Sequence, residues 1–331
     1  MITRAMDDRI DSFTPEAMLD VRYIVLPDGR RLSYTEFGDP SGFPLIYCHG
    51  PGSTRLEATL FHREAKKARF RLISFDRPGL GYSDFRKGGG QAGFAQDLLH
   101  LANSLGCEKF GLLSSGGATS LALAASCWYS DRIALVLGLS FSPPQNNFLQ
   151  ATPVFVRKLA LAALRVYAGF RQKRCARNPM RYLVRLRDTL CYADKRALED
   201  PLVLEMLSKD VKESLRQGRR GFAHDISQSI EPWEFDPEKV HVPVHLWQGG
   251  ADTLCPRHGV ESVVRQLQNA VLHTVTSRGH FFYFRLIDEV FAVANKQLNR
   301  EMRRYPVSHK RLPRKSFERE NLTTTVALHI G

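Results

Sequence analysis

The chain has 331 residues, of which 43% are hydrophobic, and it carries a formal net charge of +13. That length suits one large α/β domain with an insertion, or two smaller domains, and the hydrophobic fraction is sufficient for a sizeable core. We find no secretory signal and no apolar run long enough to span a bilayer, and the six cysteines are scattered without a C-x-x-C pair. We therefore expect a cytoplasmic protein with reduced thiols.

The positive charge is concentrated in two segments. Residues 157–187 contain ten Lys or Arg and no acidic residue, and residues 300–319 contain eight Lys or Arg and two Glu. Because the rest of the chain is near neutral, the pattern disfavours a nucleic-acid coat, and we expect no nucleic-acid partner. A local basic surface suits an anionic lipid or membrane surface, or an acidic ligand. Solvated helix faces and a disordered tail would explain the same charges.

Short apolar strands alternate with helices along the first part of the chain. Residues 21–38 predict two strands joined by an Asp-Gly turn. The strands predicted next are residues 44–48, 71–75, 110–113 and 133–140, and the helices are residues 94–105 and 119–129. This alternation is typical of a mostly parallel sheet with helices on both faces, which places the chain in the α/β class.

Between about residues 143 and 236 the alternation stops and helical periodicity replaces it. Apolar residues recur there at three- and four-residue steps, as in Phe155, Leu159, Ala162, Val166 and Phe170. Strands at 242–249 and 270–276 and a helix at 261–270 then resume the core pattern. The segments predicted are a polar lead-in (1–20), a core (21–142 and 237–298), a helical cap (143–236) and a basic, flexible tail (299–331).

Polar or glycine-rich turns directly follow five of the predicted strands. They read CHGPGS (48–53), FDRPGLGYSD (75–84), SSGG (114–117), QGGADTLCP (248–256) and RGHFF (278–282). In these motifs and their order, the chain resembles the α/β-hydrolase family over about residues 20–298. The resemblance implies an α/β-hydrolase fold with a cap, and a triad in the chain order Ser, Asp, His.

The family's nucleophile is a serine on the sharp turn between a strand and a helix. A hydroxyl on this turn needs a base within reach and small neighbours that let the turn close, which Gly116 and Gly117 supply. The register of the following helix favours Ser114, whereas taking Gly117 as the last residue of the motif favours Ser115. Leucine stands where the family has the first glycine of G-x-S-x-G.

The other two triad positions have clearer matches. Asp252 follows an apolar strand in the GGADTLCP turn, and His280 comes 28 residues later in RGHFF. A carboxylate in this place holds the imidazole in one tautomer, and the imidazole then acts as general base. The resemblance therefore assigns Asp252 and His280 to catalysis.

An oxyanion hole needs two backbone N–H donors. The resemblance implies that these come from Ser115 and from Gly50 or Gly52, in a loop that reads H-G-P-G where the family commonly has H-G-x-P-G. His49 would shape that loop. Asp76 and Arg77 in the DRPGLGYSD motif would tie neighbouring loops together.

These motifs predict a serine hydrolase that cleaves a carboxylic ester or related small acyl compound through an acyl-enzyme intermediate. It would need no cofactor, and we find no metal-ligand cluster in the sequence. The altered serine turn and H-G-P-G loop favour an alternative, a protein of weak or no turnover that binds a small ligand or partner. A peptidase of the same fold is a further alternative.

Overall fold

The structure is a computed structural model that describes residues 20–143, 163, 166, 178–188, 190–255 and 257–304. The predicted lead-in, the first part of the predicted cap and most of the predicted tail therefore lie outside the described residues. Most of the basic segment at 157–187 also lies outside them.

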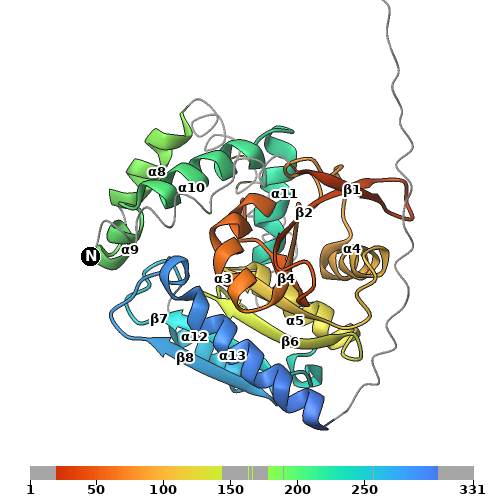
Figure 1. Cartoon of the computed structure of the whole chain (residues 1–331). Coiled ribbons are helices and arrows are strands. Elements are labelled where there is room, and N and C mark those ends of the chain that lie inside the picture. Colours follow the sequence, from red (N-terminus) through yellow and green to blue (C-terminus); the bar gives the residue numbers. More distant parts are fainter. Residues whose placement is uncertain are drawn as a thin grey trace, which may run out of the picture.

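One eight-stranded sheet forms the centre of the molecule (Figure 1), in the order β1-β2-β4-β3-β5-β6-β7-β8. The strands are β1 (Arg22–Val25), β2 (Arg31–Gly38), β3 (Phe43–Cys48), β4 (Phe70–Phe75), β5 (Phe110–Ser115), β6 (Ile133–Leu139), β7 (Val244–Gly249) and β8 (Ala270–Val275). Strand β2 runs antiparallel to β1 and β4, and every other pair is parallel. The predicted mostly parallel sheet is confirmed.

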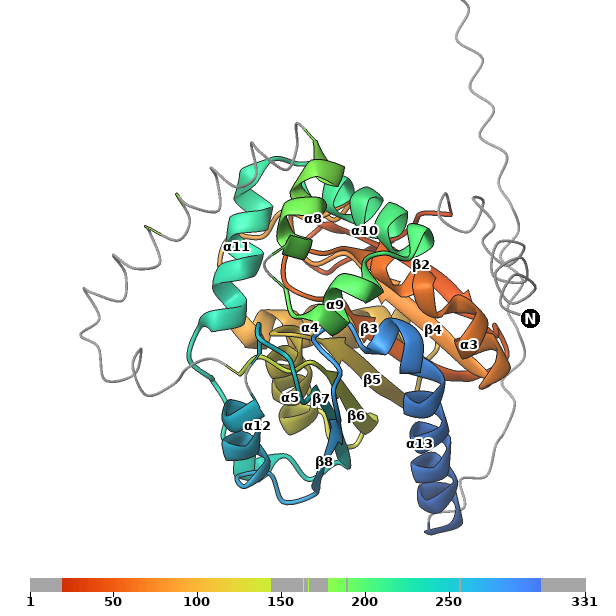
Figure 2. The ribbon, with the colours of Figure 1, turned by 90° about the vertical axis from the view of Figure 1, so that its left-hand side faces the viewer.

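Helices cover both faces of this sheet. The helices are η1 (Arg55–Phe61), α3 (His62–Lys67), α4 (Gly90–Ser104), α5 (Ala118–Trp128), α8 (Pro179–Asp188), α9 (Tyr192–Ala197), α10 (Pro201–Ser214), α11 (Arg219–Ile230), η2 (Pro237–Lys239), α12 (Arg257–Val264) and α13 (Tyr283–Arg304). Because side chains alternate along a strand, Leu112 packs in the cluster with α4, α5 and α12, and Leu113 in the cluster with α3 and α13. Figure 2 shows α12 and α13 on opposite sides of the sheet.

Helices α8 to α11 lie between β6 and β7 in the chain, within the segment predicted as the cap. Figures 1 and 2 show them together on one side of the molecule. Asp200 caps the start of α10 by accepting a hydrogen bond from Leu202 N at 3.0 Å, and Pro201 suits the first turn because it has no N–H to satisfy.

Some predicted boundaries differ from the structure. Helix α13 continues to Arg304, past the predicted start of the tail at residue 299. The helix predicted at 261–270 lies at Arg257–Val264, because β8 begins at Ala270 and a turn must precede it. No helix in the described part of the chain combines the length and apolarity needed to cross a lipid bilayer.

Candidate active site

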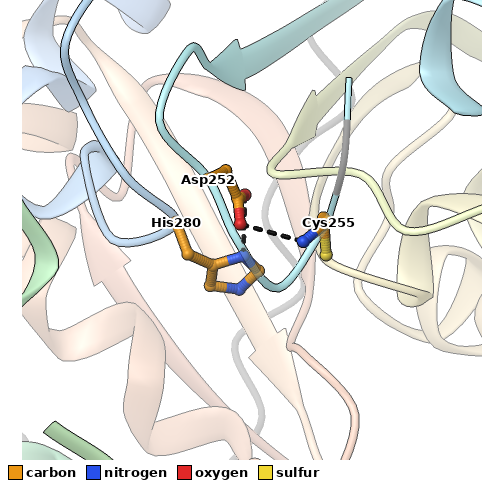
Figure 3. A group of neighbouring side chains, drawn as sticks. All are labelled: Asp252, Cys255 and His280. Atoms are coloured by element: carbon orange, nitrogen blue, oxygen red, sulfur yellow. Dashed lines mark hydrogen bonds and ion pairs between the residues drawn. The ribbon is translucent and has the colours of Figure 1, made fainter. Parts of the chain in front are cut away.

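The structure brings Asp252 and His280 together at the edge where the parallel strands end. Asp252 follows β7, and His280 lies between β8 and α13. His280 Nδ1 is 3.0 Å from Asp252 Oδ2 (Figure 3), and Oδ1 of the same carboxylate accepts from the N–H groups of Leu254 and Cys255. The carboxylate is thus fixed by its own turn and in turn orients the imidazole, leaving Nε2 as the nitrogen directed away from Asp252.

The backbone around His280 is fixed by two further residues. Asp194 lies in helix α9. Its two carboxylate oxygens accept hydrogen bonds from the N–H groups of His280 and Phe281, each at 2.8 Å. Ser140 follows β6, and its hydroxyl donates a hydrogen bond to the His280 carbonyl oxygen. A Cβ on Gly279 would lie 2.2 Å from Asp194 Oδ2, so only glycine fits there. Sequence reasoning missed Asp194.

Asp252 and Cys255 together set the charge state of His280. Burial is the largest influence and lowers the pKa of the imidazole, but the hydrogen bonds and charges of Asp252 and Cys255 together outweigh it, and the net result is a pKa of about 10 instead of 6.5. The ring therefore carries a proton at neutral pH in the ligand-free protein. It becomes a free base only in alkaline solution or when a ligand changes its surroundings.

Strand β5 is longer than predicted, and this moves the turn. Ser114 pairs with Cys48 on one side and Gly138 on the other, and Ser115 pairs with Leu139. The turn into α5 consists of Gly116 and Gly117, and Gly116 adopts a φ of +55°. The residue at the sharp bend is therefore Gly116, which has no side chain.

Ser114 lies below the turn, on the face of the sheet that α5 covers. Its side chain is fully buried, and its Oγ lies 3.0 Å from Thr119 Oγ1 and 3.2 Å from the Leu137 carbonyl oxygen. These contacts satisfy the hydroxyl within the core. The structure therefore does not bring Ser114 to His280, contrary to the arrangement that the family resemblance implied.

Ser115 points to the opposite face, into a buried polar cluster. Its Oγ is 3.0 Å from Tyr47 Oη and 3.4 Å from Glu57 Oε1, while the Tyr283 hydroxyl donates to the same Glu57 oxygen at 3.2 Å. Across the described residues, no hydrogen bond joins the hydroxyl of either serine to His280. Sequence reasoning missed Glu57 and both tyrosines, which no motif in the chain marks.

The two loop amides predicted for the oxyanion hole already have partners. Gly50 N donates to Glu57 Oε2 at 3.0 Å, and Gly52 N donates to Asp225 Oδ2 at 2.8 Å. In the structure as described, the N–H groups of Gly117 and Ala118 donate no hydrogen bond to another described residue. At the start of α5 these two amides therefore have no partner among the described residues, in contrast to the amides of Gly50 and Gly52.

His49, Asp76 and Arg77 hold the loops around the site. His49 is fully buried, and its pKa is lowered to about 3 by burial and by the charge of Arg77. Because Arg77 N donates to His49 Nε2, the Nδ1–H of His49 donates to the Gly50 carbonyl. Asp76 accepts from Arg55 N at 2.9 Å and from Ser33 Oγ at 2.7 Å. These residues shape the loops, and His49 stays neutral.

Acidic residues of the cap bind the loop that follows β3. Asp210 in α10 accepts from Thr54 N at 2.8 Å and from Ser53 Oγ at 2.7 Å. Asp225 in α11 accepts from Gly52 N and forms a buried ion pair with Arg77. Helices α10 and α11 are thereby attached to the loop, and the contact with Asp225 uses the Gly52 amide, one of the predicted oxyanion donors.

Asp210 should make stability depend on pH. Burial, followed by the negative charge of Glu57, raises its pKa from 3.8 to about 8. Between these values the folded protein holds a proton that the unfolded chain releases, so stability falls as pH rises, by at most about 1.4 kcal/mol per pH unit. We expect Asp210→Asn, which cannot ionise, to lose this slope in urea unfolding between pH 5 and 9.

The exposed Asp131 provides the control for this experiment, since Asp131→Asn removes the same charge away from the cap. That variant should keep the wild-type slope. Equal slopes in wild type and Asp210→Asn would show that Asp210 does not hold the proton.

Comparison with known proteins agrees with this architecture. Residues 45–293 match the family model described as "Alpha/beta hydrolase family". The chain belongs to the alpha/beta hydrolase family. The motifs that suggested the resemblance are therefore correctly interpreted at the level of fold and family, and a hydrolase is the class of enzyme that membership supports.

Solved structures of several hydrolases share the fold. An esterase from Thermogutta terrifontis is 20% identical, with a TM-score of 0.63, over 85% of this chain and 98% of that chain. The enol-lactonase from Burkholderia xenovorans is 17% identical, with a TM-score of 0.62, over 84% and 100%. The epoxide hydrolase CorEH is 20% identical, with a TM-score of 0.64, over 85% and 99%. A comparison with curated protein sequences found no match.

Proposed function

We propose that this member of the alpha/beta hydrolase family hydrolyses a carboxylic ester or related acyl compound by direct attack of water, with His280 as the base. The observation that carries the proposal is the 3.0 Å contact between His280 Nδ1 and Asp252 Oδ2 at the strand-end edge. An imidazole held in this way can take a proton through Nε2 and return it within one reaction.

The reaction begins when Nε2 of the neutral His280 removes a proton from water as the water oxygen bonds to the acyl carbon. Asp252 stabilises the imidazolium that forms. The carbonyl oxygen becomes negative and accepts hydrogen bonds from the N–H groups of Gly117 and Ala118, at the positive end of α5. The imidazolium then gives its proton to the leaving alkoxide as the C–O bond breaks, releasing the acid and the alcohol.

The position of these groups supports such a reaction. Strand β6 lies between β5 and β7 in the sheet, and Ser140 at the end of β6 is hydrogen-bonded to the His280 backbone. The imidazole and the amides of the α5 turn therefore belong to neighbouring loops of one edge. Because Gly116 has no side chain, we place the attacking water at this turn, where the family has its nucleophile.

Attack by Ser114 or Ser115 would require the end of β5 to rearrange. Each serine is almost fully buried, belongs to the β-ladder and has its hydroxyl bonded away from His280.

A second candidate function, ligand binding with little or no turnover, is favoured by the occupied amides of Gly50 and Gly52.

Intact mass spectrometry during turnover separates these mechanisms. The full-length protein is mixed with p-nitrophenyl esters of short and long acids and quenched in acid while p-nitrophenol is still forming. We expect product without an acyl adduct on the protein. An acyl adduct on Ser114 or Ser115 would instead establish the serine route, and absence of product from every ester would favour the ligand-binding function.

A further inference from the structure

The loop after β7 contains a third reactive side chain besides the Asp252–His280 pair. One ligand atom each from Asp252, Cys255 and His280 lies within 4.8 Å of the others (Figure 3). Asp252 and Cys255 are buried, and Cys255 forms no disulfide. The sequence analysis found no metal-ligand cluster, because the histidine comes from a different loop, beyond β8.

These three groups match the chemistry of one metal ion. Zinc binds carboxylate oxygen, thiolate sulfur and imidazole nitrogen at about 2.0–2.3 Å, which places ligand atoms about 3–4 Å apart in a tetrahedral site. The observed separations need only small side-chain movements to reach that geometry. A thiolate in the set favours zinc over magnesium or calcium, whose preferred ligands are oxygen atoms.

A buried amide lies beside two of these residues. Gln248 in β7 is fully buried, and its Nε2 donates to Asp252 Oδ2 at 3.1 Å and to the Cys255 carbonyl. These two bonds fix the orientation of the amide, which leaves Oε1 as a buried oxygen with no hydrogen-bond partner. The two bonds of Nε2 hold the Asp252 carboxylate and the Cys255 backbone in place beside each other.

The surrounding residues hold two of these ligands in place before any metal arrives. The N–H groups of Leu254 and Cys255 bind Asp252 Oδ1, which leaves Oδ2 as the oxygen facing His280. Asp194 fixes the backbone at His280. Outer contacts of this kind orient metal ligands and strengthen binding.

We propose that Asp252, Cys255 and His280 form a binding site for zinc, with three protein ligands and a water molecule in the fourth position. On binding, the Cys255 thiol loses its proton to solvent and its sulfur bonds to the metal. Zinc would then lie where His280 and Asp252 now contact each other. If the proposed function is correct, it would occupy the groups that act on water, so that bound zinc inhibits hydrolysis.

Cobalt(II) tests the site directly, because a thiolate ligand gives it a charge-transfer absorption band. Untagged full-length protein is titrated with Co²⁺, and Zn²⁺ is then added to displace it. We expect one equivalent to bind with a thiolate band. Cys255→Ser should lose the band and bind at least about 100-fold more weakly, whereas Cys127→Ser should behave as wild type. Cys127 is a matched control, since its sulfur lies outside the cluster and donates to the Asp236 carbonyl.

Alkylation of the wild-type protein gives a second measurement that needs no variant to fold. Zinc should slow the reaction of Cys255 with iodoacetamide, measured by peptide mapping, and leave Cys127 unchanged. A cobalt band that persists in Cys255→Ser, no thiolate band in the wild type, or unprotected Cys255 would overturn the proposal. Because binding is measured without substrate, these results stay separate from any failure of the proposed hydrolysis.

Discussion

In alkaline solution, where His280 is a free base, a Gly116→Ser variant is expected to react with a fluorophosphonate probe about 100-fold faster than the wild-type protein, which corresponds to the lower end of what a positioned base contributes. The reason is the position of Gly116 at the bend between β5 and α5, where a side chain would project beyond the end of the strand. A hydroxyl there would lie at the strand-end edge that also carries His280.

The substitution should be tolerated. A Cβ at position 116 would lie 3.2 Å from Pro51 Cδ, so this atom of the loop would have to shift by a few tenths of an ångström. The φ of +55° is unfavourable for serine by about 1–2 kcal/mol. That cost is small beside the 5–15 kcal/mol by which domains are typically stable. Unfolding in urea would verify that the variant remains folded at the temperature of the labelling experiment.

A neighbouring glycine supplies the matched control. Gly117 has a φ of −66° and precedes the first residue of α5, where serine is a favourable cap. Gly117→Ser therefore adds the same hydroxyl one residue further along and should stay unlabelled. The interpretation of the turn would be wrong if the wild-type protein itself were labelled and Ser114→Ala or Ser115→Ala abolished that labelling.

The sequence carries enough information for the sheet but not for the end of β5. Alternating apolar segments identify the strands because buried parallel strands are nearly continuous apolar runs. Ser114 and Ser115 break that run, so the sequence predicts a strand that ends at residue 113. In the structure both serines remain in the ladder between β3 and β6, where paired backbone groups outweigh the turn preference of serine.

The candidate site could likewise be predicted from the sequence only in part. The spacing and setting of Asp252 and His280 were sufficient to pair them, and Cys255 stands three residues from Asp252, which could have marked it. Asp194 and Asp225 were beyond prediction because they come from the cap and meet the core only through folding. Asp225 also explains why Gly52 cannot serve as an oxyanion donor: its amide is used to attach the cap.

Replacement of His280 by alanine is expected to lower kcat/KM for ester hydrolysis by about 10²–10⁴-fold, the usual contribution of a general base. The variant removes the group proposed to accept the proton of water, whereas the backbone contacts of residue 280 with Asp194 and Ser140 can persist. Kinetics are measured in the presence of a chelator, so that bound metal does not influence the rates. His241→Ala, an exposed histidine before β7, should retain wild-type kinetics.

Asp252→Asn provides the more specific test, because a purely structural role for the pair would not move a pH profile. With the pKa of His280 near 10, the base form and hence the rate should increase with pH well above neutrality. Asparagine removes the negative charge that favours the protonated ring, so the pKa falls and the rise in kcat/KM should move to lower pH, with a smaller maximum. If kcat/KM depended on pH in the same way in the wild type and in Asp252→Asn, base catalysis by His280 would be contradicted, whatever the absolute rates.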